Sequence, residues 1–283
     1  MKMLVLGASG MIGSTMVRVL SENDEWGVVG TIRSEKARSL FPASMAERMI
    51  SGVDLANTDA LLRLFREVRP DVVVNCAGLT KHLPAGNDSL SALTMNAMLP
   101  HRLAELGVIG GARLIHVSTD CVFSGASGNY RETDPPDATD IYGRTKHLGE
   151  VAGPNIVTLR TSTIGHEFGT RHGLLEWFLA QSKCKGYRRA IFSGLPTVVF
   201  AQVVRDQVIP NGELSGLYHV GARPIDKDSL LRLIAKAYSR NTVITPDDEM
   251  RIDRSLNVDR FATVTGYRAP EWPELIGTMR SYH

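Results

Sequence analysis

The chain has 283 residues, of which 43% are hydrophobic and 22% are charged, and its formal net charge is +2. These are ordinary globular values, and the length suits one large α/β domain with a smaller appended lobe. A net charge this small gives no reason to expect that the protein binds nucleic acids or membranes through its overall charge.

Apolar runs alternate with amphipathic stretches through the first half of the chain. Strands are expected at 2–7, 27–32, 71–75 and 113–118, and helices at 11–22, 58–67 and 89–107. Strands of nearly unbroken Val, Ile and Leu are buried on both faces, and strands separated by helices imply right-handed crossovers. The pattern predicts an α/β fold, with a Rossmann-like doubly wound parallel sheet over residues 1–165.

Beyond residue 165 the pattern loosens, and the tail from 241 is richer in Pro, Asp and Arg. Helices are expected at 172–182, 198–209 and 226–238, and a strand at 216–220. Because no linker stands out, we expect residues 166–283 to form a smaller substrate-binding lobe that is partly interwoven with the first domain. Part of 198–236 is expected to return to that domain.

A glycine-rich turn, Gly7-Ala8-Ser9-Gly10-Met11-Ile12-Gly13, follows the first expected strand. Glycine suits a tight turn because a Cβ would block the backbone path. The turn also lets a pyrophosphate approach the helix N-terminus, where free amides and the helix dipole favour negative charge. A plain turn is the alternative, but the position between strand and helix favours dinucleotide binding. The predicted contacts are Gly7, Ser9, Gly10, Met11, Ile12 and Gly13.

The end of the second expected strand bears on the choice of cofactor. An acidic residue there would bind a ribose 2′-hydroxyl and repel a 2′-phosphate. This sequence instead has Arg33, whose guanidinium can pair with a phosphate, although a solvated loop arginine is the alternative. We therefore predict NADPH (NADP) as cofactor. Further contacts are expected from Asp54 and Leu55, after a third strand that lies before residue 54, and from Cys76, Ala77 and Gly78, which follow the strand at 71–75.

Tyr142 and Lys146 lie four residues apart, a spacing that places them on one face of a helix. A free tyrosine has a pKa near ~10, and a nearby ammonium would lower that pKa. Tyr142 could then give a proton to a carbonyl oxygen while hydride arrives at the carbon, and Lys146 could also hold the nicotinamide ribose. Alone, this spacing is common on surface helices.

Polar residues end the strand that precedes this pair. Ser118, Thr119 and Asp120 close the run 113–118, where ligands of parallel α/β sheets bind. A hydroxyl there can hydrogen-bond a substrate oxygen and stabilise developing charge. Ordinary strand-end capping is the alternative. We assign Ser118 to the cofactor and both Thr119 and Asp120 to the substrate.

These motifs, with Asn75-Cys76-Ala77-Gly78, the segment 118–125, Tyr130-x-Glu132-x-Asp134 and the run 142–150, resemble extended short-chain dehydrogenases/reductases. The resemblance is strongest to the dTDP-4-dehydrorhamnose reductase family and covers about the first 165 residues. It implies that Thr119, Tyr142 and Lys146 are catalytic. It also implies that NADPH reduces a 4-keto group on a nucleotide-activated deoxy sugar, in polysaccharide or nucleotide-sugar biosynthesis.

Two places in the sequence qualify this resemblance. Nucleotide-sugar dehydratases usually carry Thr-Asp-Glu where this chain has Cys121 after Asp120, so the missing acid disfavours dehydration. The segment 79–84, which follows the strand at 71–75, is acidic in rhamnose-pathway reductases but contains Lys81 and His82 here. We expect both to face the substrate entrance, with a solvated loop as the alternative, and Arg160 to meet the substrate diphosphate.

Two other functions remain open from the sequence. A nucleotide-sugar 4-epimerase would use the same triad and retain its cofactor, and Arg33 argues mildly against it. A non-catalytic dinucleotide-binding regulatory subunit, such as that of methionine adenosyltransferase, would have no need of Tyr142 and Lys146, and both are present.

The cysteine content bears on compartment and metal binding. The three cysteines lack a C-x-x-C spacing, so neither a disulfide framework nor a zinc site is expected, and a reducing cytoplasm fits best. No apolar run approaches the ~20 residues of a membrane span. We expect a cytoplasmic enzyme that takes a small-molecule nucleotide sugar, with no nucleic-acid or membrane partner. A homodimer is a possible oligomeric state.

Overall fold

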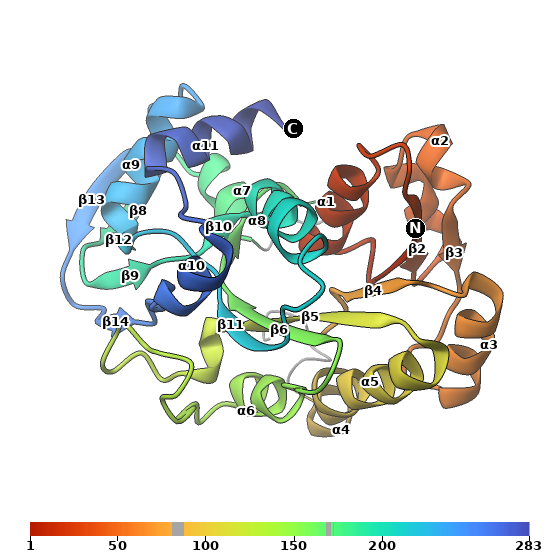
Figure 1. The fold of residues 1–283 in the computed structure, drawn as a ribbon. Coiled ribbons are helices and arrows are strands. Elements are labelled where there is room, and N and C mark those ends of the chain that lie inside the picture. Colours follow the sequence, from red (N-terminus) through yellow and green to blue (C-terminus); the bar gives the residue numbers. More distant parts are fainter. Residues whose placement is uncertain (81–87, 168–170, 172, 283) are drawn as a thin grey trace.

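A computed structural model describes residues 1–80, 88–167, 171 and 173–282 of the chain. Its central element is a seven-stranded sheet in the order β11-β6-β5-β4-β1-β2-β3, in which every pairing is parallel (Figure 1). This architecture confirms the predicted Rossmann-like doubly wound sheet. Its strands are β1 (Lys2–Leu6), β2 (Gly27–Ile32), β3 (Met49–Ser51), β4 (Val72–Asn75), β5 (Arg113–Thr119), β6 (Ile156–Thr161) and β11 (Gly216–His219).

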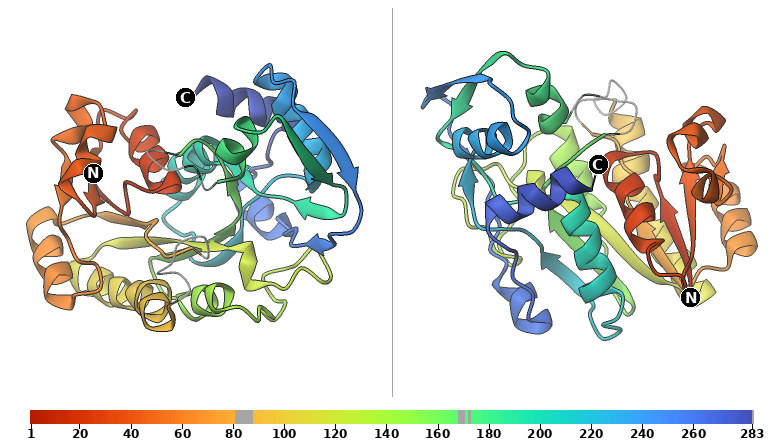
Figure 2. Two further views of the ribbon diagram at one scale, coloured as in Figure 1. Left: turned by 180° about the vertical axis from the view of Figure 1, so that it is seen from behind. Right: turned by 90° about the horizontal axis from the view of Figure 1, so that it is seen from above.

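Helices cover both faces of the sheet (Figures 1 and 2). On β1, Met3 and Val5 belong to one hydrophobic core while Leu4 and Leu6 belong to the other, because successive side chains of a strand point to opposite faces. The first core is shared with α1 (Met11–Leu20), α8 (Thr197–Val203) and α11 (Trp272–Ser281). The second is shared with α3 (Thr58–Val68) and α5 (Leu99–Gly110).

The helix expected over 89–107 is interrupted. It comprises α4 (Ser89–Ala92), a π-helical turn η3 (Leu93–Met98) and α5. Pro100 has no amide hydrogen to offer the carbonyl oxygen of Asn96 four residues earlier. Gly149 also packs against that oxygen so closely that a Cβ would lie 1.9 Å from it. These two features explain why regular α-helical bonding gives way there.

The remaining elements of the first half lie around the sheet edges and the strand ends. They are the short helices η1 (Glu35–Leu40), α2 (Ala43–Ala46) and η4 (Asp120–Val122), and the helix α6 (Ile141–Leu148). The helix α6 packs against η3 and η4, and this packing holds α6 at the carboxyl end of β5.

The second half of the chain crosses between a smaller lobe and the main sheet (Figure 2). The lobe contains β8 (Lys183–Tyr187), β9 (Ala190–Phe192), β12 (Ile225–Asp226), β13 (Val243–Asp247), β14 (Ile252–Asp253), α7 (Leu174–Leu179), α9 (Lys227–Ala237) and α10 (Asp259–Thr265). Between them lie β7 (Thr163–Ile164), β10 (Leu195–Pro196) and the π-helical η5 (Val204–Val208). The helix expected over 172–182 is only the six residues of α7. Within the described ranges, no helix combines the length and apolar character needed to cross a bilayer.

Candidate active site

The glycine-rich turn has the tight geometry that its sequence predicts. Gly7 has a φ of 78°, in the left-handed region, and a Cβ there would lie 2.9 Å from Ala77 Cα. A Cβ on Gly13 would lie 2.1 Å from the Gly7 carbonyl oxygen. Gly10 is the N-cap of α1 and no side chain caps the helix there, so the first amides of α1 are open to an anionic ligand. Side chains at Gly7 and Gly13 would collide with the backbone of Ala77 and of Gly7, so this close packing requires glycine at both positions, and we call the turn the glycine cradle.

Two hydrogen bonds to Thr31 fix this turn to the second strand. The amide of Gly7 donates to Thr31 Oγ1 at 3.2 Å, and the amide of Ala8 donates to the Thr31 carbonyl oxygen at 2.8 Å. The turn and the end of β2, where a 2′-phosphate would lie, therefore hold a fixed relation to each other.

A cavity of about 610 Å³ opens beside the turn, a volume typical of small-molecule and cofactor sites. Its wall contains nine of the predicted cofactor contacts: Gly7, Ser9, Gly10, Arg33, Asp54, Leu55, Cys76, Ala77 and Gly78. It also contains five residues that the sequence did not assign to the cofactor: Thr31, Ile32, Gly52, Val53 and Met95. Met11, Ile12 and Gly13 form the first turn of α1.

Arg33 follows β2 and is exposed on the wall of this cavity. The nearest acid along the chain, Glu35, is engaged by side chains of its own neighbourhood. Its carboxylate accepts hydrogen bonds from Arg38 and Ser51, which lower the pKa of Glu35. Arg33 is therefore the basic group that this part of the cavity presents to a phosphate.

Thr119, Tyr142 and Lys146 converge at the carboxyl end of β5. The helix α6 begins after Asp140, whose side chain accepts the Gly143 amide at 2.7 Å. Gly143 permits close approach to η4, because a Cβ there would lie 2.3 Å from the Cys121 carbonyl oxygen. The approach brings the Tyr142 hydroxyl into a hydrogen bond with Thr119.

The expected lowering of the Tyr142 pKa by Lys146 is wrong. Burial raises the pKa of Tyr142, and the neighbouring Cys121 and Asp120 raise it further. Lys146 is 5% exposed, and its ammonium donates to the Val117 carbonyl oxygen at 2.7 Å. Burial lowers the pKa of Lys146 to about 8. Tyr142 is consequently protonated at neutral pH, the state required of a group that gives up a proton.

Arg160 was expected to meet a substrate diphosphate, and its environment contradicts this. It is 2% exposed, and its Nε and Nη2 each donate to a carboxylate oxygen of Glu150 at 2.7 Å. Its Nη1 lies 3.2 Å from His219 Nε2. Ser118, assigned to the cofactor, donates through Oγ to Glu150 Oε1 at 2.7 Å. Arg160 is buried and already paired, so it holds β5, β6 and β11 together.

Asn96 is a further residue of the site, and no motif in the sequence pointed to it. Its side chain accepts the Leu79 amide at 2.8 Å and donates to the Leu79 carbonyl oxygen at 3.0 Å and to Thr145 Oγ1 at 3.2 Å. It thereby joins the segment after β4, which lines the cavity, to the helix that carries Tyr142. Its place in a π-helical turn is not visible in the local apolar pattern.

Two of the predicted substrate contacts, Lys81 and His82, lie outside the described residues. Asp120 lies at the start of η4, beside Thr119. Among the residues that the structure describes, no group of three or more His, Cys, Asp or Glu side chains is placed to hold a metal ion.

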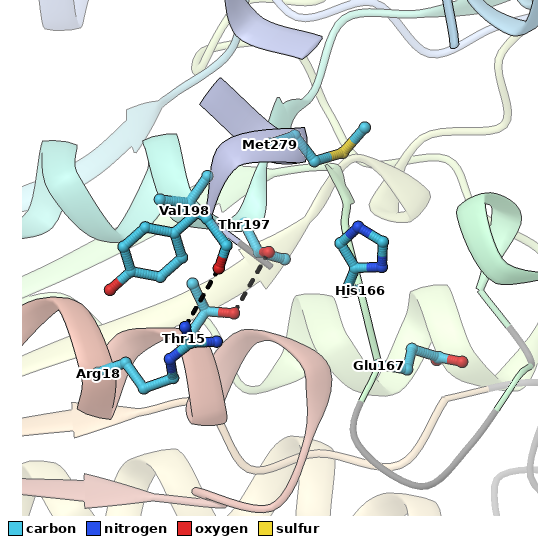
Figure 3. A pocket seen from close by; sticks show the side chains of 8 residues that line it. Thr15, Arg18, His166, Glu167, Thr197, Val198 and Met279 are labelled. Atoms are coloured by element: carbon cyan, nitrogen blue, oxygen red, sulfur yellow. Dashed lines mark hydrogen bonds between the residues drawn. The ribbon is translucent and has the colours of Figure 1, made fainter. Parts of the chain in front are cut away.

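A second, smaller cavity of about 70 Å³ lies beside α1, α8 and α11 (Figure 3). Thr15 Oγ1 donates a hydrogen bond to Thr197 Oγ1 at 3.4 Å, and Arg18 Nη2 donates to the Tyr282 carbonyl oxygen at 3.2 Å. Since ligand pockets usually enclose ~300–1,000 Å³, this space is too small for a nucleotide. It belongs to the packing between the two halves of the chain.

The chain is similar to known proteins over most of its length. Residues 1–225 match the family model of the RmlD substrate binding domain. A dTDP-4-dehydrorhamnose reductase of Aggregatibacter actinomycetemcomitans is 23% identical over 309 residues, which cover 99% of each chain. A probable dTDP-4,6-dihydroxy-2-methyloxan-3-one 4-ketoreductase of Streptomyces antibioticus is 36% identical over 169 residues. That alignment spans 57% of this chain and 51% of the relative.

A solved structure shares the fold. The crystal structure of dTDP-4-dehydrorhamnose reductase from Bacillus anthracis, in complex with NADP, superposes with a TM-score of 0.79 at 19% identity and covers 99% of both chains. This likeness extends over the sheet and the smaller lobe together.

Proposed function

The chain belongs to the family of the RmlD substrate binding domain, and from that premise we propose that it is an NADPH-dependent oxidoreductase that reduces a 4-keto group on a nucleotide-activated deoxy sugar. One observation carries the proposal. Thr119, its hydrogen-bond partner Tyr142 and the buried Lys146 meet at the end of β5. The chain that holds this triad also has a glycine cradle that opens on a cavity of cofactor size.

The residues around the cavity fit a dinucleotide. The cradle at Gly7 and Gly13 and the open amides of α1 suit a pyrophosphate, and Arg33 suits a 2′-phosphate. Asp54 and Leu55 would lie against the adenosine, and Cys76, Ala77 and Gly78 beneath the cofactor. When bound, NADPH supplies the hydride for carbonyl reduction.

The chain's own side chains complete the reaction. Thr119 and Tyr142 would hydrogen-bond the keto oxygen, and Tyr142 would donate its phenolic proton to that oxygen as the carbon is reduced to a secondary alcohol. The raised pKa of Tyr142 supports this role because it keeps the proton in place until charge develops on the oxygen. Solvent then returns a proton to the phenolate.

We further propose that the smaller lobe within residues 166–283, apart from the part of 198–236 that returns to the main sheet, covers the sugar nucleotide, and that Asp120, Lys81 and His82 contact it. Family membership supports a sugar-nucleotide site in this chain, and the paired, buried state of Arg160 argues against a diphosphate contact by that residue.

A substrate panel tests the proposal. The full chain is mixed with NADPH and a series of nucleotide-linked 4-keto sugars, and the loss of NADPH absorbance is followed, with NADH as the parallel cofactor. Stoichiometric NADPH consumption with at least one sugar supports a reductase. Sugar interconversion without net NADPH consumption would indicate an epimerase, and NADPH binding without turnover on any sugar would indicate a regulatory subunit.

A further inference from the structure

The end of β14 and the residues after it lie across the loop that follows β5 and η4. We call residues 253–257 the strap. The Asp253 amide donates to the Gly125 carbonyl oxygen at 2.8 Å, and the Tyr130 amide donates to the Ser255 carbonyl oxygen at 2.8 Å. The Asn257 amide donates in turn to the Tyr130 carbonyl oxygen at 2.7 Å. A segment more than 120 residues away in sequence is thus paired to the loop behind Thr119.

Two glycines make this close approach feasible. Gly125 and Gly128 have φ values of 87° and 71°, in the left-handed region. A Cβ on Gly125 would lie 2.5 Å from Ile252 Cγ1, and a Cβ on Gly128 would lie 2.3 Å from a carboxylate oxygen of Asp253. The loop therefore has both the backbone shape and the space that the strap requires.

Arg254 extends from the strap to the turn that begins at Thr119. Its Nε donates to the Phe123 carbonyl oxygen at 2.7 Å, and its Nη1 lies 3.8 Å from Cys121 Sγ. Its charge also acts on the carboxylate of Asp120. A single half-buried guanidinium thus acts on three residues of the turn 120–123.

That turn determines where the Thr119 hydroxyl points. Thr119 Oγ1 donates to Asp120 Oδ1 at 3.2 Å and accepts the Cys121 amide at 3.1 Å. The same hydroxyl is the hydrogen-bond partner of Tyr142. An ionised Asp120 can only accept a hydrogen bond, so it orients the Thr119 side chain while no substrate is bound, and the single hydroxyl hydrogen would turn to the keto oxygen when the sugar binds.

We propose that Arg254 is a positioning residue, which holds the turn 119–123 so that Thr119 is presented to Tyr142 and to the substrate oxygen. It acts through Asp120 and the Phe123 carbonyl group. The role rests on the proposed reductase function, because it concerns the geometry of the same proton donor.

The charged surroundings of Asp120 make the role measurable. Burial raises the pKa of Asp120, and Arg254 is the first of the groups that oppose this, followed by hydrogen bonds from Thr119, Cys121 and Ser162. Of the titratable groups around it, Cys121 lies on the same turn and Tyr142 faces it from α6. Arg254 also acts on Asp137, in the loop before α6, whose carboxylate accepts both the amide and the hydroxyl of Ser124.

Removal of the guanidinium should therefore change the pH profile. An opposite charge at close range lowers a carboxyl pKa by ~1–3 units. In Arg254→Met the acidic limb of kcat should move to higher pH by about one unit or more, because Asp120 would take up its proton earlier. Arg254→Lys keeps the charge and should leave that limb within about half a unit of wild type, with kcat lowered more than KM is raised.

The control is Arg251→Met, three residues earlier on the same lobe, where the side chain is exposed. It should leave the acidic limb and kcat unchanged. Thermal unfolding of all variants separates a loss of fold from a loss of positioning. If Arg254→Met does not fold, the Lys variant and Arg254→Gln take its place, since Gln keeps a donor but not the charge.

A second measurement does not depend on activity. The chain is labelled with 13C at aspartate carboxyl carbons, and the Asp120 signal, assigned through Asp120→Asn, is titrated in wild type and in the Arg254 variants. A higher Asp120 pKa in Arg254→Met together with the shifted kcat limb supports the role. An Asp120 titration that is the same in all variants would overturn it, whether or not a sugar substrate is found. Absence of turnover in wild type bears on the proposed function alone.

Discussion

The buried ion pair between Glu150 and Arg160 yields a quantitative prediction about stability. Both side chains are nearly inaccessible, at 8% and 2% exposed, and the guanidinium engages both carboxylate oxygens. Replacing Glu150 by Gln leaves Arg160 with an uncompensated buried charge. Breaking such a pair costs about 3–5 kcal/mol of unfolding free energy. For a chain of this length we expect the melting temperature to fall by roughly 6–10 °C.

The assay is thermal unfolding of wild type and Glu150→Gln at neutral pH, followed by calorimetry. The matched control is Asp248→Asn, which breaks the half-exposed pair with Arg188 and should cost less than about 1 kcal/mol. A loss below ~1 kcal/mol in Glu150→Gln would refute the argument that this pair organises the sheet.

The same pair has a pH signature. Burial alone would raise the pKa of Glu150, but Arg160, Ser118 and His147 outweigh it, and the pKa is lowered. A carboxyl with a lowered native pKa stabilises the fold above its unfolded pKa, near ~4.3, and this stabilisation is lost as pH falls through the native pKa. The difference between wild type and Glu150→Gln should therefore shrink in acid. A difference that stays constant down to the native pKa and below would contradict the assignment.

Three further predictions concern the cofactor and the reaction. Arg33→Ala should weaken NADPH binding by roughly 10–100-fold, because a charged hydrogen bond is worth ~1.5–3 kcal/mol. NADH binding, measured in the same fluorescence titration, should stay nearly unchanged. Equal weakening of NADPH and NADH binding would contradict a 2′-phosphate contact. Gly13→Ala should abolish cofactor binding because its Cβ would lie 2.1 Å from the Gly7 carbonyl oxygen, whereas Gly212→Ala, with nothing within 4 Å, should be neutral in the same titration. Lys146, with a pKa of about 8, loses its proton as pH rises, so kcat/KM should fall above pH 8, and a profile flat to pH 10 would argue against a role for its charge.

The parallel sheet was predictable because its strands are apolar runs with few polar residues between them. Val72–Asn75 and the first six residues of β5 are recognisable in the sequence for that reason, and the glycine turn is recognisable by its spacing. The π-helical turn at 93–98 was not, since its apolar spacing is compatible with a regular helix. Pro100 explains part of it, but the turn also depends on a contact with Gly149, about 50 residues further along the chain.

The errors in the site have a common physical origin. Arg160 lies at the end of a strand, as a ligand-binding arginine would, but its partner Glu150 lies outside that strand and becomes apparent only once the sheet is assembled. The pKa of Tyr142 was expected to follow from Lys146 one helical turn away, yet burial and the neighbours on η4 determine it. Contacts of Arg254 to Cys121 join residues 133 positions apart, which no local pattern reports.

The proton-donor role of Tyr142 is the central claim, and Tyr142→Phe tests it most directly. The variant removes one oxygen atom from the site, and NADPH affinity, measured by titration, should change little. Turnover of the best sugar in the panel should fall by about 10²–10⁴-fold, as expected for the loss of a general acid. A Tyr142→Phe protein that binds NADPH and reduces the sugar at the wild-type rate would contradict the account.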